Sequence, residues 1–179
     1  MLGGHFAVSH LADTLDLPPV EETGATFEEN AALKALAVAK ALPDVLIVAD
    51  DSGLEVAALG GAPGVRSARY AGEQASDADN VAKLLAELAR IPGADRRARF
   101  CCALVLARGG EVLVTFRGIV DGVIAEAVAG KGGFGYDPVF VPAGETRTFA
   151  ELGDAAKNEI SHRAVAVRQL RAYLHAATP

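Results

Sequence analysis

Two adjacent carboxylates follow an apolar run in the segment 45–54, VLIVADDSGL. The run Val45–Ala49 predicts a buried strand. Asp50 and Asp51 would then lie at its carboxyl end, where the sheets of α/β proteins bind ligands. Adjacent carboxylates on a turning backbone can hold one hard cation such as Mg²⁺, or divide the roles of metal ligand and general base. A solvated turn is the alternative that this pair alone leaves open.

A second charged group surrounds the helix expected over 25–42. Thr26 and Glu29 form a T-x-x-E capping box at its start. Glu22 precedes the helix, and Lys34 follows about two turns into it. Acids near a helix N-terminus interact favourably with its dipole, and a lone lysine on a helix is usually a surface charge. These residues therefore gain a chemical role only in combination with others.

A glycine-rich segment with two aromatic residues covers 130–138, GKGGFGYDP. Glycines let the backbone approach a ligand closely. Phe134 and Tyr136 suit stacking on a flat ring, although packing in the protein interior is the alternative.

The segment 157–163, KNEISHR, brings three potential cations near the start of a helix expected over 155–176. A helix N-terminus disfavours Lys157, His162 and Arg163 unless an anion compensates, although a solvated basic face is the alternative. Together the four segments supply acids for a metal, cations for phosphates and an aromatic surface for a ring. Nucleotide phosphate chemistry needs this combination of groups.

Other elements complete an α/β domain with a mixed sheet. We expect a long loop over 59–73 and a second helix that begins after Ser76 or Asp77 and ends at Pro92. Two long strands follow within 97–128, with turns at 108–110 and at Asp121-Gly122. A short strand is expected over 139–141, and a second capping box at Thr148 and Glu151.

Composition limits the classes of protein to consider. The chain has 179 residues and a net charge of −6, so it lacks the basic character of a nucleic-acid-binding protein. No apolar run approaches the roughly 18 residues of a membrane helix, and the start does not resemble a signal peptide. We therefore expect one cytoplasmic domain over 1–179. Cys101 and Cys102 are expected to be buried and unpaired, because neighbours on a strand point to opposite faces.

Four long motifs occur in an order that resembles a known family: ETGATFEENAALKA, ADDSGLEVAALGGAPGVRSARYAG, GGFGYDPVF and KNEISHRA. The sequence closely resembles the Ham1/RdgB-type inosine triphosphate pyrophosphatases. The resemblance implies an α/β fold with a long mixed sheet, flanking helices, two lobes around a cleft, and a homodimer. It also implies Mg²⁺-dependent hydrolysis of ITP, dITP and XTP to the monophosphate and pyrophosphate, which cleanses the nucleotide pool.

The resemblance also assigns roles by position. Asp51 matches the proton acceptor and a metal ligand, Asp50 supports it and shares the metal, and Glu22 matches a further metal-site acid. Lys34 matches a basic residue close to the phosphates. The positions that match substrate contacts are Ser52, the base-and-sugar loop Phe134, Gly135, Tyr136 and Asp137, and the purine pocket Lys157, His162 and Arg163.

One family motif has no counterpart here. Family members open with a strand and a T/S-x-N-x-x-K loop that cradles the triphosphate, and the chain contains no such motif. A misassigned start codon or a truncated paralogue would each explain this departure. The missing loop leaves a catalytically impaired nucleotide-binding remnant as one alternative function. A related Maf-type nucleotide pyrophosphatase is a separate alternative.

Overall fold

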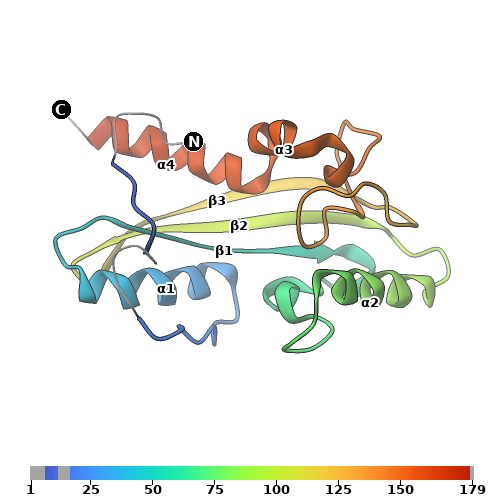
Figure 1. The fold of residues 1–179 in the computed structure, drawn as a ribbon, viewed down its shortest axis with the longest axis horizontal. Helices are drawn as coiled ribbons and strands as arrows, with labels where there is room; N and C mark the ends of the chain where they lie inside the picture. The colour runs from blue at the N-terminus through green and yellow to red at the C-terminus, as the bar shows by residue number, and fades with distance from the viewer. Residues whose placement is uncertain (1–6, 12–16, 178–179) are drawn as a thin grey trace.

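The computed structural model describes residues 7–11 and 17–177, and its centre is an antiparallel sheet (Figure 1). Its four strands are β1 (Ile47–Val56), β2 (Arg97–Arg108), β3 (Glu111–Ile124) and β4 (Phe140–Pro142). They lie in the order β1-β2-β3-β4. The α/β class with flanking helices is confirmed. Every pairing between these strands is antiparallel, so the described residues contain no parallel pair of the expected mixed sheet.

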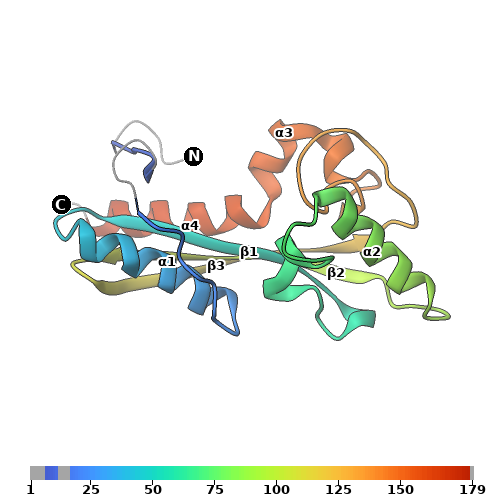
Figure 2. The same ribbon diagram turned by 60° about the horizontal axis from the view of Figure 1, so that its bottom comes forward.

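Helices cover both faces of this sheet. The helices are α1 (Phe27–Ala41), α2 (Asp77–Ala89), α3 (Phe149–Ile160) and α4 (His162–Ala177). Helix α1 packs on one face, and α4 packs on the opposite face (Figure 2). Helix α2 and Phe149 of α3 join β1, β2 and β4 in a third cluster of buried side chains.

The alternation of side chains along β2 explains why helices can pack on both of its faces. Cys101, Ala103 and Val105 face α1, whereas Cys102 and Leu104 face α4. Both faces of the strand are buried, so its sequence is almost continuously apolar. Both cysteines are buried and free, as expected.

Strand β1 differs from its prediction in extent and burial. It begins at Ile47 and continues through the aspartates to Val56, so Asp50 and Asp51 lie within the strand and not at its carboxyl end. Val45, Leu46 and Val48 are 44–49% exposed. The prediction of a buried strand over 45–49 is therefore wrong. The apolar run is exposed because β1 is the edge strand of the described sheet.

The expected turn at Asp121-Gly122 is also wrong, because both residues lie inside β3. Asp121 pairs with Arg99, and Gly122 pairs with both Ala98 and Pro142. A Cβ on Gly122 would lie 2.3 Å from the carbonyl oxygen of Val141. This glycine therefore permits close approach of β4 and does not mark a turn. The turn at 108–110 is confirmed, with positive φ at Gly109 and Gly110.

The single helix expected over 155–176 is two helices that meet at Ser161. The backbone of Ser161 is extended, and its hydroxyl accepts a hydrogen bond from the Ala164 amide. This cap begins α4. The apolar periodicity continues across the break between α3 and α4, so it did not reveal the break. The capping box at Thr148 and Glu151 is confirmed at the start of α3.

The remaining predictions agree more closely. Ser76 caps α2 with a full capping box. The long loop over 59–73 contains a 3₁₀ turn at Gly64–Arg69. Among the described residues, no helix has both the length and the apolar composition needed to cross a membrane.

Candidate active site

An acidic and basic cluster lies on the α1 face of β1. Lys34 Nζ lies 3.0 Å from Asp51 Oδ1 and 3.1 Å from Glu22 Oε1. Arg69 continues the cluster, with Nη1 3.1 Å from Glu22 Oε2. Asn30 donates from its amide nitrogen to Asp51 Oδ2 at 3.2 Å. Helix α1, strand β1 and two loops thus bring together three residues that the sequence predicted, Glu22, Lys34 and Asp51.

The charges in this cluster stabilise one another's ionised forms. Burial alone would raise the pKa of Glu22, but hydrogen bonds from Lys34 and Arg69 outweigh it and lower the pKa. Burial alone would lower the pKa of Lys34, but hydrogen bonds to Asp51 and Glu22 raise it. Lys34 therefore stays a cation and Glu22 an anion near neutral pH.

Asp50 lies on the opposite face of the strand, because successive side chains in a strand alternate. Its Oδ2 accepts from Arg163 Nη2 at 2.8 Å and from Ser52 Oγ at 3.1 Å. This placement contradicts the expectation that Asp50 shares a metal with Asp51. Asp50 instead holds the guanidinium of Arg163 beside Ser52.

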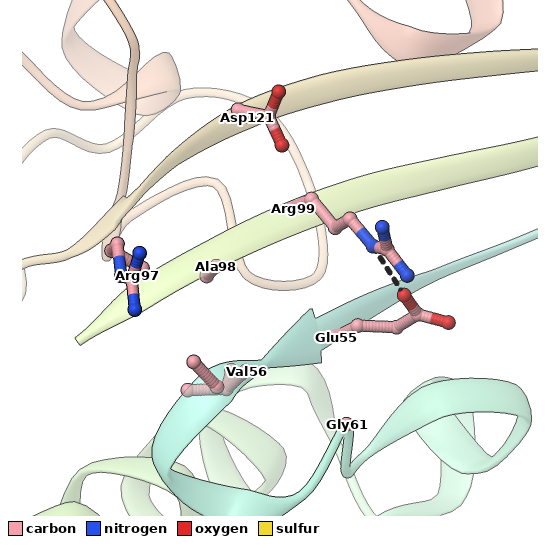
Figure 3. A pocket seen from close by; sticks show the side chains of 8 residues that line it. Glu55, Val56, Gly61, Arg97, Ala98, Arg99 and Asp121 are labelled. Carbon is pink, nitrogen blue, oxygen red and sulfur yellow. Dashed lines mark hydrogen bonds and ion pairs between the residues drawn. The ribbon is translucent and has the colours of Figure 1, made fainter. Parts of the chain in front are cut away.

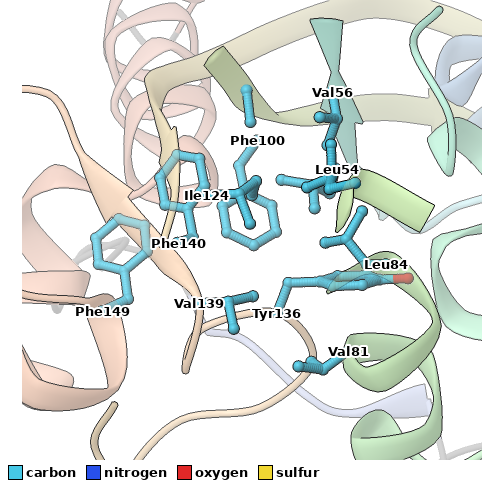
Figure 4. Close-up of a cluster of buried hydrophobic side chains, with 12 residues drawn as sticks. Leu54, Val56, Val81, Leu84, Phe100, Ile124, Tyr136, Val139, Phe140 and Phe149 are labelled. Carbon is cyan, nitrogen blue, oxygen red and sulfur yellow. The ribbon is translucent and has the colours of Figure 1, made fainter. Parts of the chain in front are cut away.

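The glycine-rich loop presents only one of its two aromatic rings. Phe134 is 59% exposed, and Lys157 Nζ lies 3.7 Å from its ring centroid. Tyr136 is buried beside Val81 and Leu84 (Figure 4), and its hydroxyl donates to the carbonyl oxygen of Ser67. The expectation that the Tyr136 ring stacks on a ligand is therefore wrong, because no face of the ring is open.

Asp137 organises the same loop from inside the protein. It is 1% exposed, accepts from the Phe134 amide at 2.9 Å, and forms an ion pair with Lys157. Gly135 has φ +59, and its amide donates to Asp77 Oδ2 at 2.6 Å. These contacts fix the backbone that carries Phe134.

His162 lies between the two basic residues of its motif. It is 5% exposed and stacks on Phe100 with ring centroids 4.8 Å apart. Burial, followed by the charges of Arg163 and Lys157, lowers its pKa to about 3. The imidazole is neutral near pH 7, and its Nδ1 has no hydrogen-bond partner among the described residues. In a neutral imidazole one ring nitrogen donates a hydrogen bond and the other accepts one.

The carboxylates suit a metal that also binds substrate oxygens. Within residues 7–11 and 17–177, no group of three or more His, Cys, Asp or Glu side chains is arranged to hold a metal ion. Glu22 and Asp51 both contact Lys34, so two hard oxygen ligands converge there. Mg²⁺ is typically bound by one or two carboxylates with water and substrate phosphates. Glu22 and Asp51 are the carboxylates of this cluster that could serve as such ligands.

A separate depression of about 370 Å³ lies farther along the sheet (Figure 3). Its charged lining is Glu55, Arg97, Arg99 and Asp121, and none of the predicted site residues lines it. Arg99 Nε donates to Glu55 Oε2 at 2.5 Å. The depression is therefore separate from the Asp51 cluster.

Sequence reasoning missed three residues of the site: Asn30, Arg69 and Asp77. Asn30 lies four positions before Lys34, so both residues share the helix face toward Asp51. A polar residue among the apolar positions Phe27, Ala31 and Ala35 of α1 is the signal that could have revealed it. The long-range contacts of Arg69 and Asp77 have no comparable local signal.

Comparison with known proteins places the chain in a family. Residues 1–173 match the Ham1 family model. The chain belongs to the Ham1 family. It is 54% identical over 163 residues to a dITP/XTP pyrophosphatase of Geobacillus kaustophilus, covering 91% of this chain and 79% of that protein. It is 50% identical over 171 residues to a dITP/XTP pyrophosphatase of Bacillus subtilis, covering 96% and 86%.

Solved structures agree with this assignment. The Ham1 protein of Staphylococcus aureus superposes with a TM-score of 0.84 at 47% identity, over 94% of this chain and 84% of that one. A Ham1 protein of Coxiella burnetii gives a TM-score of 0.83 at 45% identity, over 88% and 81%. The fold described above is therefore that of the Ham1 family.

Proposed function

We propose that this protein hydrolyses deaminated purine nucleoside triphosphates, namely ITP, dITP and XTP, to the monophosphate and pyrophosphate. The reaction would remove them from the nucleotide pool. The observation that carries the proposal is the charged site on β1. It occurs in a chain that is 54% and 50% identical to two dITP/XTP pyrophosphatases. The Glu22–Lys34–Asp51 cluster lies on one face of β1, and the Asp50–Arg163 pair lies on the other.

Glu22 and Asp51 would hold Mg²⁺, which neutralises phosphate charge when bound. Asp51 orients the attacking water and accepts its proton. Lys34 stabilises the negative charge that develops on the phosphates. Lys34 contacts both acids already, so its ammonium is positioned without a large rearrangement.

The purine would lie against the exposed Phe134 ring, near Lys157, His162 and Arg163. Hypoxanthine and xanthine carry a carbonyl acceptor at position 6, whereas adenine carries an amino donor. A pocket that presents donors there leaves the adenine donor unpaired, which is costly. Rejection of guanine requires contacts at position 2, because guanine also carries the 6-carbonyl.

Steady-state rates on a nucleotide panel test this proposal. We expect kcat/KM with Mg²⁺ to be highest for ITP, dITP and XTP, and lower for ATP by at least about 100-fold. Binding of ITP without turnover would instead support the nucleotide-binding remnant. Preference for UTP or dTTP would support a Maf-type activity.

Two further parts of the proposal concern assembly and location. We propose a homodimer, supported by the half-exposed Ile119 and Val123 on the sheet, which are available to a second copy. Molar mass by light scattering tests it. We propose the cytoplasm as the location because the nucleotide pool used by polymerases lies there.

A further inference from the structure

Asn30 is a fully buried amide next to the proposed catalytic carboxylate. Its side chain lies on α1 and is 0% exposed. A buried amide is costly unless it forms hydrogen bonds. Asn30 Oδ1 accepts from the Gly24 amide at 2.8 Å, and its Nδ2 donates to Asp51 Oδ2 at 3.2 Å. Both ends of the amide are therefore used.

These two hydrogen bonds join the segments that carry Glu22 and Asp51. Gly24 is two residues beyond Glu22, so the first bond anchors the Glu22 loop to α1. The second bond fixes one oxygen of Asp51, and Lys34 contacts the other at 3.0 Å. The Asp51 carboxylate is thus held at both oxygens by one helix face, which sets the plane of the carboxylate.

The packing around Gly24 shows how closely the loop approaches this amide. A Cβ at Gly24 would lie 2.7 Å from Asn30 Oδ1 and 2.7 Å from Glu29 Cβ. Only a residue without a side chain allows this approach. The contact between the loop and the amide therefore requires both the glycine at position 24 and the asparagine at position 30.

We infer that Asn30 is a positioning residue for the reaction: it sets the Asp51 carboxylate and the Glu22 loop in one fixed geometry. This inference rests on the proposed function. Asn30 is 0% exposed, so its side chain lies out of reach of a bound substrate. It acts through Asp51 and Glu22, as groups that orient metal-binding carboxylates do.

Asn80 provides a matched control for this inference. It is 2% exposed, lies on α2, and also forms two hydrogen bonds through its amide. Its Oδ1 accepts from the Ala71 amide at 2.8 Å, and its Nδ2 donates to the Ala68 carbonyl at 3.0 Å. Asn80→Ala thus removes as many buried hydrogen bonds as Asn30→Ala, with none to Asp51.

The test compares ITP kinetics of the two alanine variants. We expect Asn30→Ala to lower kcat by about 10- to 100-fold relative to Asn80→Ala, because a displaced catalytic group reacts slowly. KM for ITP should change much less than kcat. Equal kcat values in the two folded variants would overturn the inference.

Binding of Mg²⁺ alone gives a readout that does not depend on turnover. The Mg²⁺ concentration that half-saturates the rise in thermal midpoint, without nucleotide, should increase about tenfold in Asn30→Ala. It should change much less in Asn80→Ala, because the Asn80 hydrogen bonds hold the loop that carries Arg69 and do not reach Asp51. An unchanged Mg²⁺ midpoint in Asn30→Ala would contradict the inference.

A near-isosteric variant covers the case in which Asn30→Ala does not fold. Asn30→Asp keeps an acceptor for the Gly24 amide but replaces the donor to Asp51 with oxygen. We expect a similar loss of kcat, whereas wild-type kcat would overturn the inference. If the wild-type protein does not hydrolyse ITP, the proposed function fails, and the Mg²⁺ comparison still decides the role of Asn30.

Discussion

Asp50 and Asp51 are neighbours in sequence with separate surroundings. Asp51 contacts Lys34 and Asn30 on the α1 face, and Asp50 contacts Arg163 on the α4 face. The residue types predicted that both acids matter. The sequence did not predict that they face opposite sides of the sheet. The expected strand ended at Ala49, whereas β1 continues through both aspartates and its side chains alternate between the two faces.

The two aspartates should therefore respond differently to the same substitution. We expect Asp51→Asn to lower kcat for ITP by at least about 100-fold, because an amide cannot accept the proton of water. Asp50→Asn should mainly raise KM, because it releases Arg163 from a half-exposed ion pair. Steady-state kinetics of both variants, with circular dichroism as a check on folding, measure this. Equal losses of kcat would refute the division of roles.

His162 should make stability depend on pH. Its pKa is about 3 in the folded protein and near 6.5 when unfolded, so the unfolded chain binds the proton first as pH falls. The stabilisation is complete above the unfolded pKa and is lost as pH falls toward the folded pKa. The groups whose charges act on His162 are Arg163, Lys157 and Asp50.

Urea denaturation at several pH values measures this effect. Between about pH 7 and pH 5, we expect the wild type to lose about 2 kcal/mol more unfolding free energy than His162→Gln loses. Acidic groups elsewhere titrate in both proteins, so the difference isolates the histidine. Parallel stability curves would show that His162 titrates normally.

At the scale of elements, the contact between β3 and α4 positions the proposed purine pocket. A Cβ at Gly118 would lie 1.9 Å from the His162 carbonyl oxygen and 2.8 Å from the Ala166 nitrogen. The first turn of α4 therefore rests directly on the β3 backbone. The sequence gives no local sign of this, because Gly118 lies in an otherwise regular strand pattern.

Gly118→Ala should force α4 away from the sheet. We expect a loss of unfolding free energy of about 1–3 kcal/mol, as for overpacked cores. The shift of His162 and Arg163 should also raise KM for ITP more than it lowers kcat. Urea denaturation and ITP kinetics measure the two effects. A stability change within about 0.5 kcal/mol, the range of surface substitutions, would contradict this packing.

For the whole molecule, patterns within one element were predictable from sequence and contacts between elements were not. The start of α2 and the β2–β3 turn follow from Ser76 and from Gly109-Gly110, whose preferences are local. The burial of Tyr136 and the contact of Arg69 with Glu22 depend on distant segments. The break at Ser161 was missed because apolar periodicity continues across it.

The products formed from ITP test the central claim most directly. Wild-type protein is incubated with ITP and Mg²⁺, and inosine monophosphate, inosine diphosphate, pyrophosphate and phosphate are quantified by chromatography. We predict equimolar monophosphate and pyrophosphate, with none of the diphosphate. Formation of the diphosphate and phosphate, or bound ITP that is never cleaved, would contradict the account.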